Sequence, residues 1–126
     1  LVDVFLGADA FNQDIGAWNT ANVETMLRTF NETDSFNQDI GDWNTSKVVS
    51  MTDMFHNAKA FNQDIGEWDT SKADMFRMFQ GAVAFNQNLS EWCVEDIESK
   101  PTDFDEGAAS WTGGDDTRPQ WGEVCD

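Results

Sequence analysis

Asparagine and aspartate residues recur at fixed spacing along the chain, and their side-chain oxygens could bind a hard cation. The hexapeptide Phe-Asn-Gln-Asp-Ile-Gly begins at Phe11, Phe36 and Phe61, and a diverged copy begins at Phe85. The recurring amide and carboxylate residues are Asn12, Asp14, Asn37, Asp39, Asn62 and Asp64. Oxygen atoms of these kinds are the ligands that Ca²⁺ prefers in proteins. The pattern predicts calcium as the cofactor of these loops.

The spacing within each copy also resembles a calcium-binding loop. When Asn12 is counted as position one, ligand positions three, five, seven and nine are occupied by Asp14, Gly16, Trp18 and Thr20. The next two copies place Gly41, Trp43, Thr45, Gly66, Trp68 and Thr70 at the corresponding positions. The Gly and Trp residues would offer carbonyl oxygens only. The analogy is incomplete, because Ile15 and Val23 stand where an EF-hand loop has Gly and Glu.

A structural role explains the same residues without a metal. Asn and Asp side chains accept hydrogen bonds from backbone amides in turns. Thr20, Thr45 and Thr70 could cap the first turns of helices, and a flat file of exposed Thr is a further alternative. The sequence leaves calcium ligation and turn formation both open.

The elements that would position these residues repeat with the same period. Val48, Met51, Met54, Phe55 and Ala58 follow one another at helical intervals, which predicts a short helix with one buried face. We expect the hexapeptide to be extended, which would place Phe11, Gln13 and Ile15 on one side and Asn12, Asp14 and Gly16 on the other. Because one repeat cannot bury its own aromatic residues, successive repeats must stack.

We therefore expect an α/β repeat solenoid that resembles a leucine-rich-repeat protein. Each repeat of about 25 residues would hold one short helix and one short extended segment, and stacking would place Asp14, Asp39 and Asp64 about 4.8 Å apart. The alternative fold is a mostly α-helical stack joined by EF-hand-like loops. In either fold, the core would include the tryptophans and methionines Trp18, Trp43, Trp68, Trp92, Met26, Met51, Met54, Met75 and Met78.

The repeats occupy residues 1–92, and residues 93–126 read as an irregular C-terminal cap. Trp111 and Trp121 would cover the last repeat. Cys93 and Cys125 are predicted to form a disulfide, which favours an oxidising compartment. The chain starts inside a repeat, so we expect an open N-terminal edge that contacts a protein partner or a second copy of the chain.

Charge and composition argue against several functions. The 24 acidic and 7 basic residues give a net charge of -17, which repels nucleic acid and anionic lipid. No apolar stretch has the roughly 18 residues that membrane insertion requires. The single histidine, His56, corresponds to Leu6 and Asn31 in other repeats, and no cluster of nucleophile and base recurs. We predict that the chain is not an enzyme.

The pattern Phe-Asn-Gln-Asp-Ile-Gly-x-Trp-x-Thr-Ser, followed by Met-x-x-Met-Phe, resembles the bacterial surface protein 26-residue repeat of BspA-type leucine-rich-repeat-like proteins. The resemblance covers residues 1 to about 92. It implies an extracellular or cell-surface location, adhesion or protein binding, and no catalytic activity. We therefore expect a non-catalytic scaffold that binds calcium through its Asn-Gln-Asp loops and mediates protein–protein contact or adhesion. The alternative is a metal-independent surface adhesion or interaction module.

Overall fold

The computed structural model describes residues 1–125, and regular secondary structure is almost absent from them. Within this range the only helix is the 3-10 helix η1 (Gly114–Thr117). β-Structure in the same residues is limited to two isolated parallel bridges, Thr25–Ser50 and Ser50–Asp74. The predicted α/β solenoid with leucine-rich-repeat-like units is therefore wrong, and so is the predicted helix stack with EF-hand-like loops.

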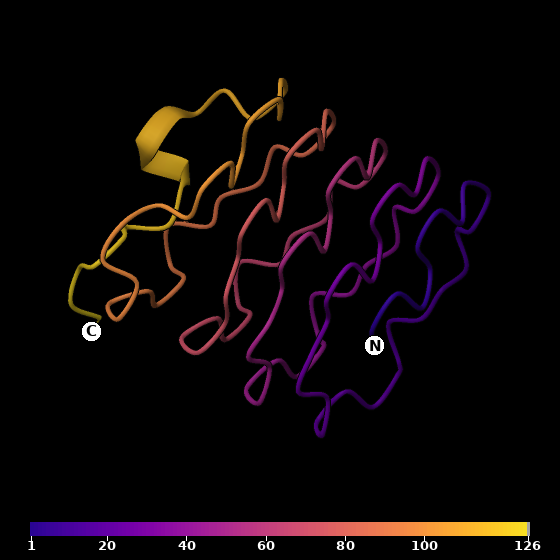
Figure 1. Cartoon of the computed structure of the whole chain (residues 1–126), viewed down its shortest axis with the longest axis horizontal. Coiled ribbons are helices and arrows are strands. Elements are labelled where there is room, and N and C mark those ends of the chain that lie inside the picture. Colours follow the sequence, from indigo (N-terminus) through magenta and orange to yellow (C-terminus); the bar gives the residue numbers. More distant parts are fainter. Residues whose placement is uncertain (126) are drawn as a thin grey trace.

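The chain winds instead into successive coils of turns and loops that lie side by side (Figure 1). Alternate backbone amides of one coil donate to carbonyls of the next. Between the first two coils these bonds are Asp3 to Leu27, Phe5 to Thr29 and Gly7 to Asn31, at 2.9 to 3.1 Å. The amide of Leu6, between two such donors, bonds back to the carbonyl of Asp3 at 3.2 Å. An α-helix would direct its amides four residues back within the same segment, so this pattern explains why no α-helix forms.

Two backbone positions in each coil have positive φ, which an α-helix does not accommodate. The first has φ values of 52 to 57° and is occupied by Asp3, Arg28, Asp53, Arg77 and Asp103. The second has φ values of 57 to 78° and is occupied by Gly7, Glu32, Asn57, Gly81 and Gly107. The left-handed conformation costs a non-glycine residue roughly 1–2 kcal/mol. The hydrogen bonds between coils and the core packing offset this cost.

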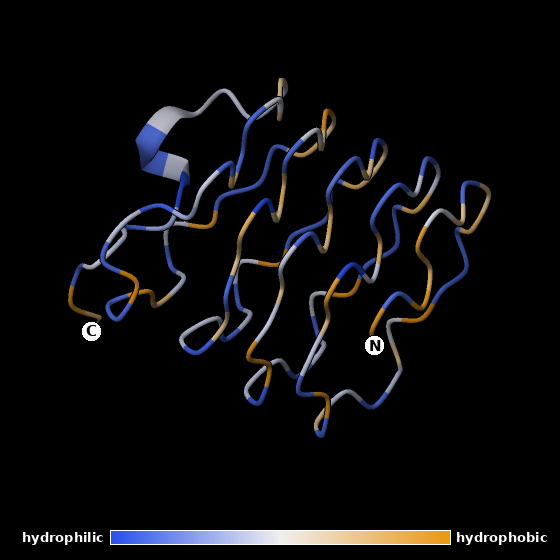
Figure 2. Cartoon of the chain, in the orientation of Figure 1, coloured by the Kyte–Doolittle hydropathy of each residue, from blue (hydrophilic) through white to orange (hydrophobic). Residues whose placement is uncertain are grey.

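Aromatic and methionine side chains fill the space enclosed by the coils. The rings of Phe30 and Phe36 stack at a centroid distance of 4.1 Å, and Phe30 also lies 5.6 Å from Phe55 of the next coil. All five methionines are buried, which confirms their predicted core role. Hydrophobic stretches therefore recur in each coil and alternate with hydrophilic ones (Figure 2).

The C-terminal segment closes one end of the stack. The coil pattern continues past residue 92, because the amide of Phe79 donates to the carbonyl of Phe104 at 2.8 Å. Trp111 then packs edge-on against Phe85, with ring centroids 5.0 Å apart. The amide of Leu89 donates to the carbonyl of Thr117 at 2.9 Å, which places η1 against the last hexapeptide.

In residues 1–125 no helix has the length and apolar character needed to cross a membrane.

Candidate functional site

The asparagines of the hexapeptides connect each coil to the next. Asn12 Oδ1 accepts hydrogen bonds from the backbone N–H of Asn37 at 2.9 Å and from Nε2 of Gln38 at 3.0 Å. Asn37 and Asn62 make the same pair of bonds toward the following coils. At the hexapeptides, side-chain amides thus make the hydrogen bonds between coils that backbone groups make in a β-ladder. The predicted ladder of strands does not form.

The aspartates of the hexapeptides bond within their own loops. Asp39 Oδ1 accepts a hydrogen bond of 2.9 Å from the N–H of Gly41, and the loops of Asp14 and Asp64 have the same bond. In the diverged copy Asn88 Oδ1 accepts the equivalent bond from Ser90, also at 2.9 Å. A carboxamide therefore performs this role as well as a carboxylate does. The bond is the turn-forming one that the structural interpretation of the sequence predicted.

The glycines of the hexapeptides allow the next coil to approach closely. A Cβ atom on Gly41 would lie 2.6 Å from the carbonyl oxygen of Asp64, and one on Gly16 would lie 2.6 Å from that of Asp39. No side chain fits at that distance, so close backbone approach requires glycine here. The third copy is less tight, with 3.0 Å between a Cβ on Gly66 and the carbonyl oxygen of Asn88.

The threonines assigned as metal ligands are buried between coils. Thr20 Oγ1 donates to the carbonyl of Asn44 at 3.1 Å, and Thr45 Oγ1 donates to that of Asp69 at 3.0 Å. Thr70 is also fully buried. These residues cap no helix, and they form no exposed file of hydroxyl groups. The hydroxyls of Thr20 and Thr45 contribute to the register between coils, whereas Thr70 Oγ1 has no hydrogen-bond partner within residues 1–125.

The tryptophans form a second file of contacts between coils. Trp43 Nε1 donates to the carbonyl of Ile15 at 3.0 Å, and Trp68 Nε1 donates to that of Ile40 at 3.1 Å. The indole rings of Trp43 and Trp68 are nearly parallel, with centroids 6.4 Å apart. Trp43, Trp68 and Trp92 are buried, which confirms the predicted core packing for these three. Trp18, in the first coil, is 43% exposed.

The side-chain oxygens predicted to bind calcium therefore point to separate partners. Asn12 Oδ1 is directed to the next coil, Asp14 Oδ1 to its own Gly16, and Thr20 Oγ1 into the protein. Among residues 1–125, one group of three Cys, His, Asp or Glu side chains has ligand atoms within 4.8 Å of one another, and its members are Cys93, Glu95 and Cys125. None of the hexapeptide aspartates belongs to it. This geometry gives the calcium-binding prediction no support.

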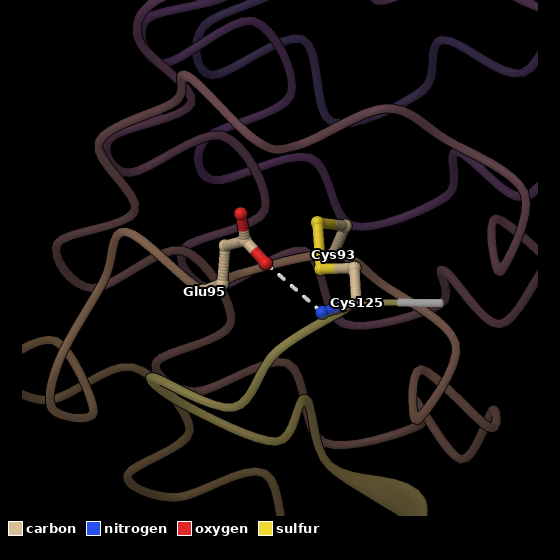
Figure 3. A group of neighbouring side chains, drawn as sticks. All are labelled: Cys93, Glu95 and Cys125. Atoms are coloured by element: carbon tan, nitrogen blue, oxygen red, sulfur yellow. Dashed lines mark hydrogen bonds between the residues drawn. A yellow bond between two sulfur atoms is a disulfide. The ribbon is translucent and has the colours of Figure 1, made fainter.

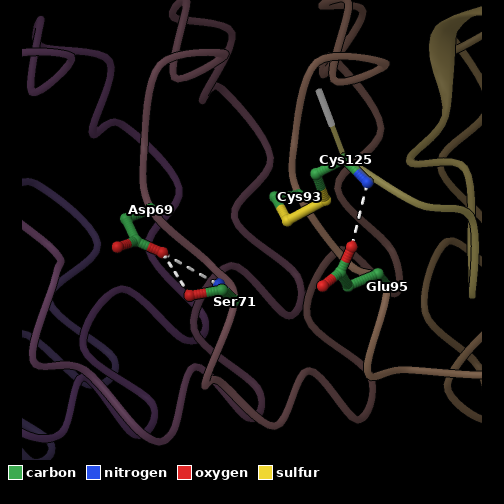
Figure 4. The surroundings of a disulfide bond; sticks show 5 residues. All are labelled: Asp69, Ser71, Cys93, Glu95 and Cys125. Carbon is green, nitrogen blue, oxygen red and sulfur yellow. Dashed lines mark hydrogen bonds between the residues drawn. A yellow bond between two sulfur atoms is a disulfide. The ribbon is translucent and has the colours of Figure 1, made fainter.

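Cys93 and Cys125 form a disulfide, as the sequence predicted. Glu95 lies beside it, and its Oε2 accepts a hydrogen bond of 3.0 Å from the backbone N–H of Cys125 (Figure 3). Figure 4 places the disulfide near the turn in which Asp69 Oδ1 accepts bonds from Ser71. Because the two sulfur atoms are bonded to each other, they offer no thiolate to a metal. The disulfide fastens the C-terminal segment to the stack.

An acidic depression lies between the third and fourth hexapeptides. Its volume is about 840 Å³, and its lining includes Asp64, Glu67, Asp69 and Glu91. The neighbouring depression, of about 260 Å³, adds Asp39 and Asp42. Carboxylates that share one surface raise the local concentration of cationic groups. The depression can therefore favour the approach of a basic partner.

Among residues 1–125, no coil lies on the side of the first coil that faces away from the second, and we call this side the N-terminal face. It comprises Val2, Val4, Leu6, Phe11 and Trp18. Val2, Val4 and Leu6 are 49%, 47% and 42% exposed, respectively. Phe11 is partly exposed, whereas its equivalent Phe36 is fully buried. The sequence predicted an open edge but assigned Trp18 to a metal loop.

Comparison with known proteins finds one match, to a family model. No curated protein and no solved structure shows a significant match to the chain. A family model described as "Mycoplasma protein of unknown function, DUF285" matches residues 1–112. The matched residues include all four hexapeptide copies and the coils that they connect. The chain therefore belongs to the DUF285 family.

Proposed function

We propose that this chain is a non-catalytic, metal-independent interaction module that contacts protein. The observation that carries the proposal is the use of Asn12, Asn37 and Asn62 as bridges between coils. Side chains that resemble calcium ligands in the sequence are engaged in holding the stack together. The repeated hexapeptide thus has a structural role, and the surfaces it supports are left to bind a partner.

The single histidine offers no support for catalysis. His56 Nδ1 lies 3.6 Å from Asp53 Oδ1, and Arg77 Nε lies 2.9 Å from the same oxygen. This group is an ion-pair cluster between two coils, with no nucleophile among its members. Its geometry favours a structural role over that of a general base.

The disulfide supports a location in an oxidising environment, such as the cell surface or the extracellular space. The resemblance of the hexapeptide pattern to BspA-type surface repeats points the same way, and it favours adhesion or protein binding. The family description itself assigns no function. We therefore place the module outside the cytoplasm as part of the proposal.

Calcium titration of the chelator-treated chain, followed by calorimetry and thermal melting, tests metal independence. We expect no binding heat and no change in melting temperature. Asp39→Ala should lower stability by about 1 kcal/mol, because the bond to Gly41 is lost. Asp39→Asn is the matched control, since Asn88 makes this bond naturally, and it should leave stability within about 0.5 kcal/mol of the unmodified chain.

Saturable calcium heat that Asp39→Asn reduces would refute the metal-independent proposal. That result would identify the hexapeptide carboxylates as calcium ligands, because Asp39→Asn keeps the turn and removes only the negative charge.

A further inference from the structure

Three tripeptides of the form Asn-x-Ser or Asn-x-Thr occur in the chain, and this is the motif at which an oligosaccharide is transferred to asparagine. Their asparagines are Asn31, Asn44 and Asn88, and the hydroxyl residues two positions later are Thr33, Ser46 and Ser90. Residue type alone makes the three sites equivalent. The fold separates them, because the three asparagines differ in exposure and in hydrogen bonding.

Asn44 lies in an exposed turn of the second coil. Its Oδ1 accepts hydrogen bonds from the backbone N–H of Ser46 at 3.0 Å and from Ser46 Oγ at 2.7 Å. Within residues 1–125, its Nδ2 donates no hydrogen bond. The turn thus holds the hydroxyl that the motif requires against the carboxamide. A sugar on Nδ2 would break neither of these bonds, because both are made by the oxygen.

Asn88 is presented in the same way by the diverged hexapeptide. Its Oδ1 accepts a hydrogen bond of 2.9 Å from the N–H of Ser90, and the residue is exposed. It also lines the acidic depression of about 840 Å³, so its carboxamide borders open space. The third hexapeptide has Asp64 and Gly66 at the corresponding positions. The diverged copy therefore combines the amide and the hydroxyl that the other hexapeptides lack.

Asn31 is enclosed by the stack. The residue is 6% exposed, and Thr33 is fully buried with its Oγ1 bonded to the carbonyl of Phe30 at 2.8 Å. The carbonyl of Asn31 also accepts a hydrogen bond of 2.9 Å from the N–H of Gly7 in the first coil. An oligosaccharide is bulky and hydrated, and it requires surface. A chain that carries one at Asn31 cannot form these contacts.

The turn itself does not require the residues of the motif. In the first coil Asn19 Oδ1 accepts a bond of 3.1 Å from the N–H of Ala21. In the third coil Asp69 Oδ1 accepts one of 3.0 Å from the N–H of Ser71. The turn therefore forms without the hydroxyl and also without the amide nitrogen. Of these three equivalent turns, that of Asn44 alone has both groups.

We infer that Asn44 and Asn88 are sites of N-linked glycosylation, whereas Asn31 is unmodified in the folded chain. The donor is a lipid-linked oligosaccharide pyrophosphate. Asparagine Nδ2 forms a bond to the anomeric carbon of the first sugar and loses one proton, while the bond from that carbon to the pyrophosphate oxygen breaks. The step involves no oxidation or reduction. This inference goes beyond the proposed contact function and rests on the proposed location outside the cytoplasm.

Secretion of the full chain from a eukaryotic cell, behind a cleavable leader, tests the inference. The cell supplies both the transferase and the lipid-linked donor. The secreted, disulfide-bonded chain is treated with a peptide N-glycosidase, which converts each modified asparagine to aspartate. Peptide mass spectrometry then locates the conversions, with an untreated sample as the reference. We expect conversion at Asn44 and Asn88 and none at Asn31.

Aspartate substitutions are the matched loss-of-site variants. Asn44→Asp keeps the turn, because Asp69 forms it in the next coil. Asn88→Asp also keeps its turn, because Asp64 forms that one. Each variant should lose one glycan, measured as one step in electrophoretic mobility. The melting temperatures of both variants after deglycosylation should equal that of the deglycosylated unmodified chain.

Ala21→Ser is the converse change. It completes the motif at Asn19, which is exposed and already forms the turn. We expect this variant to gain a third glycan, because it then matches Asn44 in both sequence and geometry.

Three outcomes would overturn the inference. They are a folded, secreted chain without a glycan at Asn44 or Asn88, a folded chain with a glycan at Asn31, and an Ala21→Ser variant that gains none. Failure of the proposed function is separable, because calcium binding would refute metal independence whatever sugars the chain carries. Conversely, a secreted chain with its disulfide but without sugar would reject these sites and leave the proposed location intact.

Discussion

The indole Nε1 of Trp43 donates a hydrogen bond of 3.0 Å to the carbonyl of Ile15, in the coil before its own. Both residues are 4% exposed, so the bond is made away from solvent. A buried donor or acceptor that loses its partner pays the full cost of desolvation. The contact therefore fixes the orientation of one coil on the next, and Trp68 and Trp92 repeat it along the stack.

Replacement of Trp43 by Phe should destabilise the chain more than the same change at Trp18. Trp43→Phe leaves the carbonyl of Ile15 without its donor, which should lower the free energy of unfolding by about 1–3 kcal/mol. Trp18→Phe is the matched control, because Trp18 is 43% exposed, and it should cost less than about 0.5 kcal/mol. Urea denaturation followed by circular dichroism measures both. Equal losses would show that the buried bond contributes nothing to stability.

Substitution of a hexapeptide asparagine should lower stability only where the following coil donates hydrogen bonds to its side chain. Asn37 Oδ1 accepts bonds from the N–H of Asn62 and from Nε2 of Gln63. Asn37→Ala should therefore lower the free energy of unfolding by about 1–3 kcal/mol. Asn86 is the last asparagine of this series, and Asn86→Ala keeps the backbone bond that its own N–H makes to Asn62. The two variants are compared by thermal melting, and a larger loss at Asn86 would contradict the bridging role.

Reduction of the disulfide should loosen the C-terminal segment. Cys93 and Cys125 are separated by 32 residues, and closing a loop of this length stabilises a folded chain by roughly 3–4 kcal/mol in the chain-entropy model. We expect a lower melting temperature in the presence of a reductant. The double variant Cys93→Ser with Cys125→Ser is the control, and its melting temperature should not respond to the reductant. An unchanged melting temperature for the unmodified chain would argue against a stabilising role.

Asp105 should make the stability of the C-terminal end depend on pH. Burial opposes ionisation of its carboxyl group, but hydrogen bonds from Lys100 at 2.6 Å and Arg118 at 3.0 Å outweigh burial and lower the pKa. A carboxyl group with a lower pKa in the folded state stabilises the fold above its ordinary pKa of about 3.9. This contribution is lost as the pH falls further, through the lowered pKa of the folded state.

Asp105→Asn tests this dependence. The unmodified chain should have a higher free energy of unfolding than the variant. This difference should be largest at about pH 7 and should shrink below about pH 4. Urea denaturation at a series of pH values measures the difference. If the difference stayed constant down to about pH 3, ionisation of Asp105 would not contribute.

The repeat spacing predicted several contacts that the structure contains. Equivalent residues of successive repeats lie next to each other, as the stacked rings of Trp43 and Trp68 do. The methionines are in the core, and Cys93 is bonded to Cys125. These features follow from residue type and period, because any stack of identical units brings equivalent apolar side chains together.

The type of backbone structure could not be predicted in the same way. Met51, Met54, Phe55 and Ala58 all face the core, but apolar residues at intervals of three and four also face inward in a series of turns. The metal interpretation of Asn12 and Asp14 failed for a similar reason. Side-chain oxygens of the same type serve as calcium ligands, as turn-forming acceptors or as bridges between coils, and the sequence does not say which partner lies nearby.

The sequence by itself determined the period of the chain, its apolar core positions and its pair of cysteines. Only the tertiary structure decided that the repeats are coils of turns, that Asn12 bridges to Asn37, and that Trp18 is exposed while Trp43 is buried. The physical reason is that the deciding hydrogen bonds join residues about 25 positions apart. A helix satisfies its amides within one segment, whereas these amides and side chains find their partners only after the neighbouring coil has docked.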